Sequence, residues 1–152
     1  MLKLKSLKDQ TEEETQLFMN ENSPVAETSP TTSPYLFNSA QRGCQHSGGT
    51  YIEGIVSSLF GEVTGAHVSL GSSPGGNVIQ TIVTGKDRSA GYYTFVIRAE
   101  GPYPGTFYVW VTDTAGKPLS DPNGGRVVTN AIRSGDDPAA CWQANVDFVA
   151  VR

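Results

Sequence analysis

The chain has 152 residues with 17 Gly, 9 Pro, 2 Cys and 2 His, a formal net charge of −4 and 17% charged residues. This length fits one compact domain with a tail and is too short for a TIM barrel. No apolar run approaches the roughly 20 residues that cross a bilayer, and 11 Lys and Arg against 15 Asp and Glu provide no basic stripe for phosphates. We therefore expect neither a membrane span nor nucleic-acid binding.

The amino-acid composition changes sharply along the chain. All 17 Gly lie at or after Gly43. Residues 23–34 include nine Ser, Thr or Pro among twelve positions, so they have too few apolar side chains to offset the entropy lost on ordering. Before them, a capping-box spacing predicts a short helix over residues 11–20. We expect an extended N-terminal arm over residues 1–42 and a folded domain over residues 43–152.

The first residues are rich in Lys, like the n-region of a signal peptide. An acidic run over residues 9–14 stands where the apolar h-region of such a peptide would follow. The sequence therefore predicts no signal peptide in this chain.

Short apolar stretches of period two, separated by clusters of Gly, Pro, Asp and Asn, follow one another from residue 51 onward. This pattern predicts an all-β domain with strands at residues 51–57, 66–70, 78–84, 92–98, 106–112, 126–132 and 142–151. About seven short strands suit an antiparallel β-sandwich of the immunoglobulin-like type. Because successive side chains alternate across a sheet, we place five of them in the core: Phe107, Val109, Val111, Val146 and Phe148.

The two cysteines bracket these strands, with Cys44 just before the first and Cys141 opening the last. A disulfide between them would close a loop of about 100 residues and, in the chain-entropy model, remove on the order of 4 to 5 kcal/mol of denatured-state freedom. The alternatives are two free thiols in a cytosolic protein, or a nucleophilic Cys44 assisted by His46. An extended segment separates side chains two residues apart, and no carboxylate adjoins them. We therefore favour the disulfide and expect no enzyme.

Acidic and amide side chains gather in the turns of the second half of the chain, where their oxygen atoms would suit Ca²⁺. The candidates are Asp113, Asp121, Asn123, Asp136 and Asp137. The same residue types form turns by bonding to their own backbone, and no DxDxDG loop occurs. We favour turn formation, with Ca²⁺ as the alternative and no other cofactor.

Two aromatic residues, Tyr108 and Trp110, alternate with the predicted core residues of their strand and so lie on its opposite face. Exposed there, they are a candidate platform for stacking on sugar rings. The alternatives are a surface for self-assembly and a second packed layer.

A short apolar segment, Tyr35, Leu36 and Phe37, ends the N-terminal arm. An open sheet edge can accept an extended segment as an added strand. We therefore predict that this segment is added to a neighbouring copy of the chain.

Motifs along the chain occur in a recognisable order: IEGIV at residues 52–56, GEVTGAHVSL at 61–70, SAGYYTF at 89–95, PGTFYV at 104–109, GKPLSD at 116–121 and, after Cys141, VDFV at 146–149. They resemble the carboxypeptidase-regulatory-like domain, a transthyretin-like β-sandwich of secreted and surface bacterial proteins that is related to their B-type repeats. The resemblance covers residues 44–152. It implies an immunoglobulin-like, non-catalytic module that serves as a stalk, spacer, adhesion unit or accessory domain of an enzyme.

These observations together predict a non-enzymatic extracellular or cell-surface structural protein that assembles with copies of itself, as a filament or a surface layer. The alternative is a module that binds carbohydrate or another surface ligand through exposed aromatic side chains.

Overall fold

A computed structural model describes residues 33–86 and 89–152 of the chain. The predicted helix over residues 11–20 and nearly all of the Ser/Thr/Pro-rich stretch lie outside these residues. The described part contains no helix, and therefore none that could span a membrane. Its nine strands are β1 (Phe37–Gln45), β2 (Thr50–Ser58), β3 (Gly61–Glu62), β4 (His67–Gly71), β5 (Val78–Val83), β6 (Tyr92–Arg98), β7 (Gly105–Thr112), β8 (Arg126–Thr129) and β9 (Gln143–Ala150). The predicted all-β class is confirmed.

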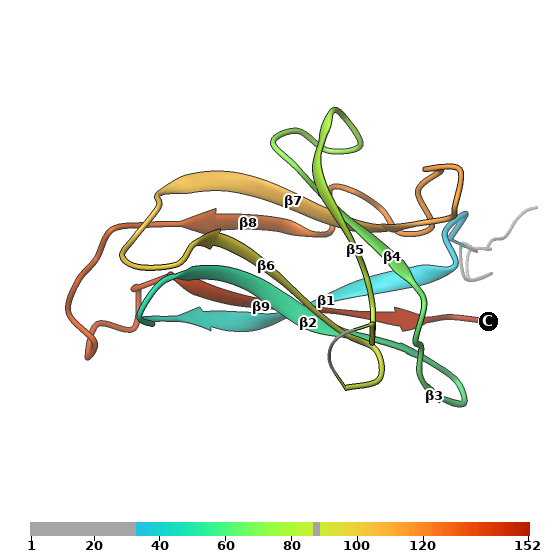
Figure 1. Cartoon of the computed structure of the whole chain (residues 1–152), viewed down its shortest axis with the longest axis horizontal. Coiled ribbons are helices and arrows are strands. Elements are labelled where there is room, and N and C mark those ends of the chain that lie inside the picture. The colour runs from blue at the N-terminus through green and yellow to red at the C-terminus, as the bar shows by residue number, and fades with distance from the viewer. Residues whose placement is uncertain (1–32, 87–88) are drawn as a thin grey trace, which may run out of the picture. The chain divides into compact units, whose positions relative to one another are not determined.

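The strands form two sheets, which Figure 1 shows as two layers. One sheet has the order β1-β9-β2-β3, with β6 also paired to β2, and the other has the order β5-β4-β7-β8. All strand pairs are antiparallel except β2 with β9, which is parallel. The sandwich was expected to be antiparallel throughout, but its first sheet is mixed, because β2 and β9 run parallel.

The core lies between the two sheets and takes alternate side chains from both. Ile52, Val56, Tyr93, Phe95, Val146 and Phe148 come from the first sheet, and Val68, Leu70, Val109, Val111 and Val127 come from the second. The five predicted core residues are all buried, with exposed fractions between 0% and 8%. Alternation of apolar side chains therefore identified the inner faces of β7 and β9 correctly.

The folded unit begins earlier than residue 43, because it spans Tyr35–Arg152 and its first strand begins at Phe37. Residues 37–42, which the composition places in the arm, pair with β9 from Asn38 opposite Val149 to Gln41 opposite Val146. The expected boundary is wrong for a physical reason. Strand β1 lies at a sheet edge and buries only Phe37, so it carries no period-two apolar pattern.

Candidate functional site

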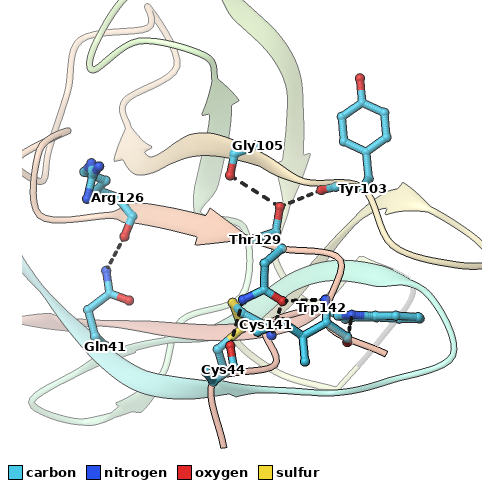
Figure 2. The surroundings of a disulfide bond; sticks show 11 residues. Gln41, Cys44, Tyr103, Gly105, Arg126, Thr129, Cys141 and Trp142 are labelled. Atoms are coloured by element: carbon cyan, nitrogen blue, oxygen red, sulfur yellow. Dashed lines mark hydrogen bonds between the residues drawn. A yellow bond between two sulfur atoms is a disulfide. The ribbon is translucent and has the colours of Figure 1, made fainter. Parts of the chain in front are cut away.

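The disulfide predicted from the cysteine positions joins Cys44 to Cys141, whose Cα atoms are 4.9 Å apart. Cys44 lies near the end of β1, opposite Ala144, and Cys141 lies in the segment that enters β9. Figure 2 shows the bridge beneath the end of β8. The bond links the first strand to the last, so the free-thiol and nucleophile alternatives for Cys44 do not apply.

The segment around the bridge is held by the side chain of Asn130. Its Nδ2 donates to the carbonyl of Ala139 at 2.7 Å, and its Oδ1 accepts from the main-chain N–H groups of Cys141 at 3.0 Å and Ile132 at 3.3 Å. The main-chain N–H of Asn130 donates to the carbonyl of Cys141 at 3.0 Å. One amide side chain therefore closes the β8–β9 connection onto the disulfide.

Trp142, next to the disulfide, is 4% exposed. Its Nε1 donates to the carbonyl of Ile132 at 2.8 Å, as Figure 2 shows for the indole nitrogen, and its ring centroid lies 4.3 Å from that of His46. At the end of β8, the Thr129 hydroxyl donates to the carbonyl of Tyr103 at 2.5 Å. These contacts make this end of the domain a packed and hydrogen-bonded closure, with His46 serving as a ring partner.

A polar cluster surrounds Glu53 on β2. Its Oε1 accepts from the hydroxyl of Tyr92 at 2.8 Å, and its Oε2 accepts from Nε2 of Gln143 at 2.5 Å. The Thr94 hydroxyl donates to the Tyr92 oxygen at 2.7 Å. Both carboxylate oxygens are thus engaged by side chains of the neighbouring strands β6 and β9, which ties the sheet together across β2.

The pairing of β2 with β9 is interrupted between Glu53 and Val56, beside this cluster, and resumes in the same register. The N–H of Ile55 bonds to the carboxylate of Asp147 at 2.9 Å, and Asp147 also pairs with Nε of Arg42 at 3.2 Å. The carbonyl of Val146 accepts from the hydroxyl of Tyr93, which is fully buried. Burial raises the pKa of Tyr93 well above its ordinary value, and the charge of Asp147 raises it further. The Tyr93 hydroxyl therefore stays protonated and able to donate.

The predicted aromatic platform is wrong for Trp110, which is 2% exposed. Its ring lies against Gly71 on the adjacent strand, where an added Cβ would come within 2.8 Å of Cη2. The alternation of side chains correctly places the Trp110 ring on the face of β7 opposite the core residues. The ring is nevertheless buried there, because Gly71 has no side chain to occupy the space. Tyr108, opposite Gly71 in the register, is half-buried, so the two residues do not form a flat exposed pair.

The segment expected to join a neighbouring copy instead completes its own sandwich. Phe37 is 6% exposed and belongs to the core, and its N–H donates to the carbonyl of Leu119 at 2.9 Å. Leu36 packs against the same core, and its carbonyl accepts from the N–H of Val151 at 2.9 Å. Tyr35 is half-buried at the start of the folded unit. The prediction that these residues extend to another copy is therefore corrected.

The acidic candidates for Ca²⁺ lie in turns. Oδ1 of Asp113 accepts from the N–H groups of Ala115 and Lys117 at 2.9 and 2.8 Å. Oδ1 of Asp121 accepts from the N–H of Asn123 at 3.0 Å, and Oδ1 of Asp137 from that of Ala139 at 2.9 Å. Asp136 is exposed beside Asp137. No group of three or more metal-ligating side chains occurs in the described part of the chain. These contacts are the turn bonds that Asp side chains make with their own backbone.

Comparison with known proteins found no match to this chain among family models, curated proteins or solved structures.

Proposed function

We propose that the chain is a non-enzymatic structural module of an extracellular or cell-surface protein, and that its copies assemble with one another. The observation that carries this proposal is the disulfide between Cys44 and Cys141. Such bonds form and persist in oxidising compartments and are rare in the cytosol. Here the bond joins β1 to the segment that enters β9, the last strand.

The positions of the sequence motifs support an immunoglobulin-like, carboxypeptidase-regulatory-like domain as the finer fold type. The motif at residues 52–56 lies within β2, and the last four residues of the motif at residues 89–95 open β6. The closing motif at residues 146–149 lies within β9. Motifs that fall on strands in the expected order, with turns between them, are what that family resemblance implies.

Exposed apolar side chains support the self-assembly part of the proposal. Leu59 and Phe60, between β2 and β3, are 68% and 98% exposed, and Ile79 on β5 is 60% exposed. Contiguous exposed apolar patches mark interaction sites, and these side chains are our candidates for such a surface. Because residues 35–37 belong to their own sandwich, strand addition by that segment is not part of the proposal.

The proposed extracellular or cell-surface location is tested on the protein isolated from its native cells. An alkylating agent blocks free thiols during lysis. Mass spectrometry then reports whether Cys44 and Cys141 carry the label. We expect both cysteines to be unlabelled until a reductant is added. Labelling of both before reduction would overturn the extracellular assignment.

Assembly is tested on the purified full-length chain under non-reducing conditions. Light scattering and negative-stain electron microscopy over a rising protein concentration should show particles larger than a monomer. A single monomeric species at every concentration would overturn the self-assembly part of the proposal while leaving the location unaffected.

A further inference from the structure

Strand β5 (Val78–Val83) is an open edge of the second sheet. Its only strand neighbour in the described residues is β4. Its sequence, VIQTIV, has no charge, proline or glycine, and four of its six residues are β-branched Val or Ile. Natural edge strands usually carry Lys, Pro or a distortion that blocks pairing with other chains, because their unpaired main-chain groups are a template for a further strand.

Two of the other edge strands, β1 and β8, are better protected. On β1, the register shifts between Gln41 and Gly43, beside Arg42, whose side chain is 64% exposed. Strand β8 has only four residues and begins with Arg126, whose carbonyl accepts from the Gln41 side chain at 3.0 Å. Strand β5 also has a register shift, at Ile79, and its residues 80–83 pair regularly with β4. With no charged residue and no proline, β5 is more suited than β1 or β8 to accept another strand.

The direction of the main-chain groups on β5 follows from the residues just after it. The N–H of Thr84 donates to the carbonyl of Ala66 at 2.8 Å, on the β4 side, and the N–H of Gly85 points the other way, to the carbonyl of Tyr92. Main-chain groups alternate along an antiparallel strand. Those of Thr81 and Val83 therefore point away from β4, toward the open edge.

A cavity that is open to solvent lies beside that edge. This cavity of about 310 Å³ is lined by the second half of β5 and by the first residues of β6, among them Thr81, Val83, Tyr92 and Thr94. The outward main-chain groups of Thr81 and Val83 therefore adjoin a solvent-open cavity, and β5 pairs with no strand of the described domain on that side.

A second copy of β5 can provide hydrogen-bond partners for the outward main-chain groups of this edge, because the sequence of β5 pairs well with itself. In such a pair, two copies of β5 run antiparallel and are related by a two-fold axis normal to the sheet. Each side chain then stays on its own face of the sheet, so odd-numbered residues lie opposite odd-numbered ones and even-numbered residues opposite even-numbered ones. A register centred on Thr81 places Thr81 opposite itself and Val83 opposite Ile79, the residue at which the pairing with β4 shifts. Both pairs join β-branched side chains, which is favourable across strands, and neither brings like charges together.

We infer that β5 is the surface at which two copies of this chain pair, antiparallel about a two-fold axis at Thr81. Pairing joins the two four-stranded sheets into one continuous sheet, and the symmetric contact closes at two copies. The inference rests on the proposed self-assembly and names the surface that starts it. Further growth into larger particles needs a different surface.

The experiment exploits the position of Thr81 on the axis. Thr81→Lys and Thr81→Glu are each made in the full-length chain, and each puts two like charges directly opposite each other in the pair. Thr81 is exposed, so either side chain can reach solvent in the single copy. Val128→Lys, at a 48% exposed position on the β8 edge, is the matched control. Circular dichroism confirms that each variant is folded.

Sedimentation equilibrium is measured for each variant alone and for an equimolar mixture of the two Thr81 variants. We expect each Thr81 variant alone to weaken dimerisation by about tenfold or more, because like charges face each other. The mixture should dimerise at least as well as the wild type, and Val128→Lys should dimerise unchanged. Dimers that survive both Thr81 changes, or a mixture that stays monomeric, would overturn this inference alone. A wild-type chain that is monomeric throughout would overturn the self-assembly proposal with it.

Discussion

The buried hydroxyl of Tyr93 on β6 donates a hydrogen bond to the main-chain carbonyl of Val146 on β9, although β2 lies between these strands in the sheet. The intervening position on β2 is Gly54, which pairs with Tyr93 in the register. A Cβ at Gly54 would collide with the carbonyl oxygen of Val146. The absence of a side chain at Gly54 therefore gives the carbonyl access to the core, where the Tyr93 hydroxyl satisfies it.

Tyr93→Phe tests this bond. The change removes the hydroxyl and leaves a buried carbonyl without that donor, so we expect a loss of about 1 to 3 kcal/mol in the free energy of unfolding. Urea denaturation measures it. Tyr103→Phe, at a position 47% exposed, is the matched control and should change the stability little. Equal stability of the two variants would contradict the role assigned to the Tyr93 hydroxyl.

The same residue predicts a dependence of stability on alkaline pH. Burial holds the folded-state pKa of Tyr93 well above the ordinary value of about 10, so the folded state keeps a proton that the unfolded state releases. The stability from this residue is therefore complete below about pH 10 and is lost as the pH rises from there through the folded-state pKa. Unfolding free energies measured across this range should fall more steeply for the wild type than for Tyr93→Phe. Parallel curves would count against the raised pKa.

Gly54→Ala tests the close approach of β2 to β9. The new methyl group would overlap the carbonyl oxygen of Val146, so the strands must separate, and we expect a loss of about 2 kcal/mol or more. Gly48→Ala is the control, since a Cβ there meets no atom within 4 Å. Thermal unfolding of the two variants should differ clearly, with Gly48→Ala near the wild type. A Gly54→Ala protein as stable as its control would show that the two strands can move apart at little cost.

Removal of the disulfide tests its contribution to stability. In the chain-entropy model, opening a bridge between residues 97 positions apart restores denatured-state freedom worth on the order of 4 to 5 kcal/mol. We expect the double variant Cys44→Ala, Cys141→Ala to lose about this much in chemical denaturation. The wild type measured with a reductant is the control and should behave alike. An unchanged midpoint in both samples would mean that the bridge constrains little of the unfolded chain.

The sequence predicted the elements whose side chains alternate. On β7, Phe107, Val109 and Val111 were assigned to the core because polar or aromatic residues separate them, and the structure buries all three. Strand β1 was not predicted, because an edge strand that buries only Phe37 leaves no such pattern. The alternation of apolar residues therefore predicts which face of a strand is buried, but it predicts edge strands poorly.

The contacts between distant strands could not be predicted in the same way. Gly54, Tyr93 and Val146 meet only because three strands are adjacent in the folded sheet, and no spacing in the chain marks them. Trp110 shows the same limit, since its burial depends on the missing side chain of Gly71 on another strand. Such details depend on register, which a single sequence does not specify.

The β1–β9 pairing has a mechanical consequence. Phe37 lies opposite Ala150, so both ends of the described domain leave the sandwich at the same place. Tension on those ends would unzip the two strands one residue pair at a time, from Phe37 toward Cys44. At Cys44 the covalent bond to Cys141 halts the unzipping, and the loop between the cysteines is shielded from the pull. Only the residues outside the bridge can then lengthen, by about 3.3 to 3.6 Å each, which gives a tether built from this domain a defined maximum extension.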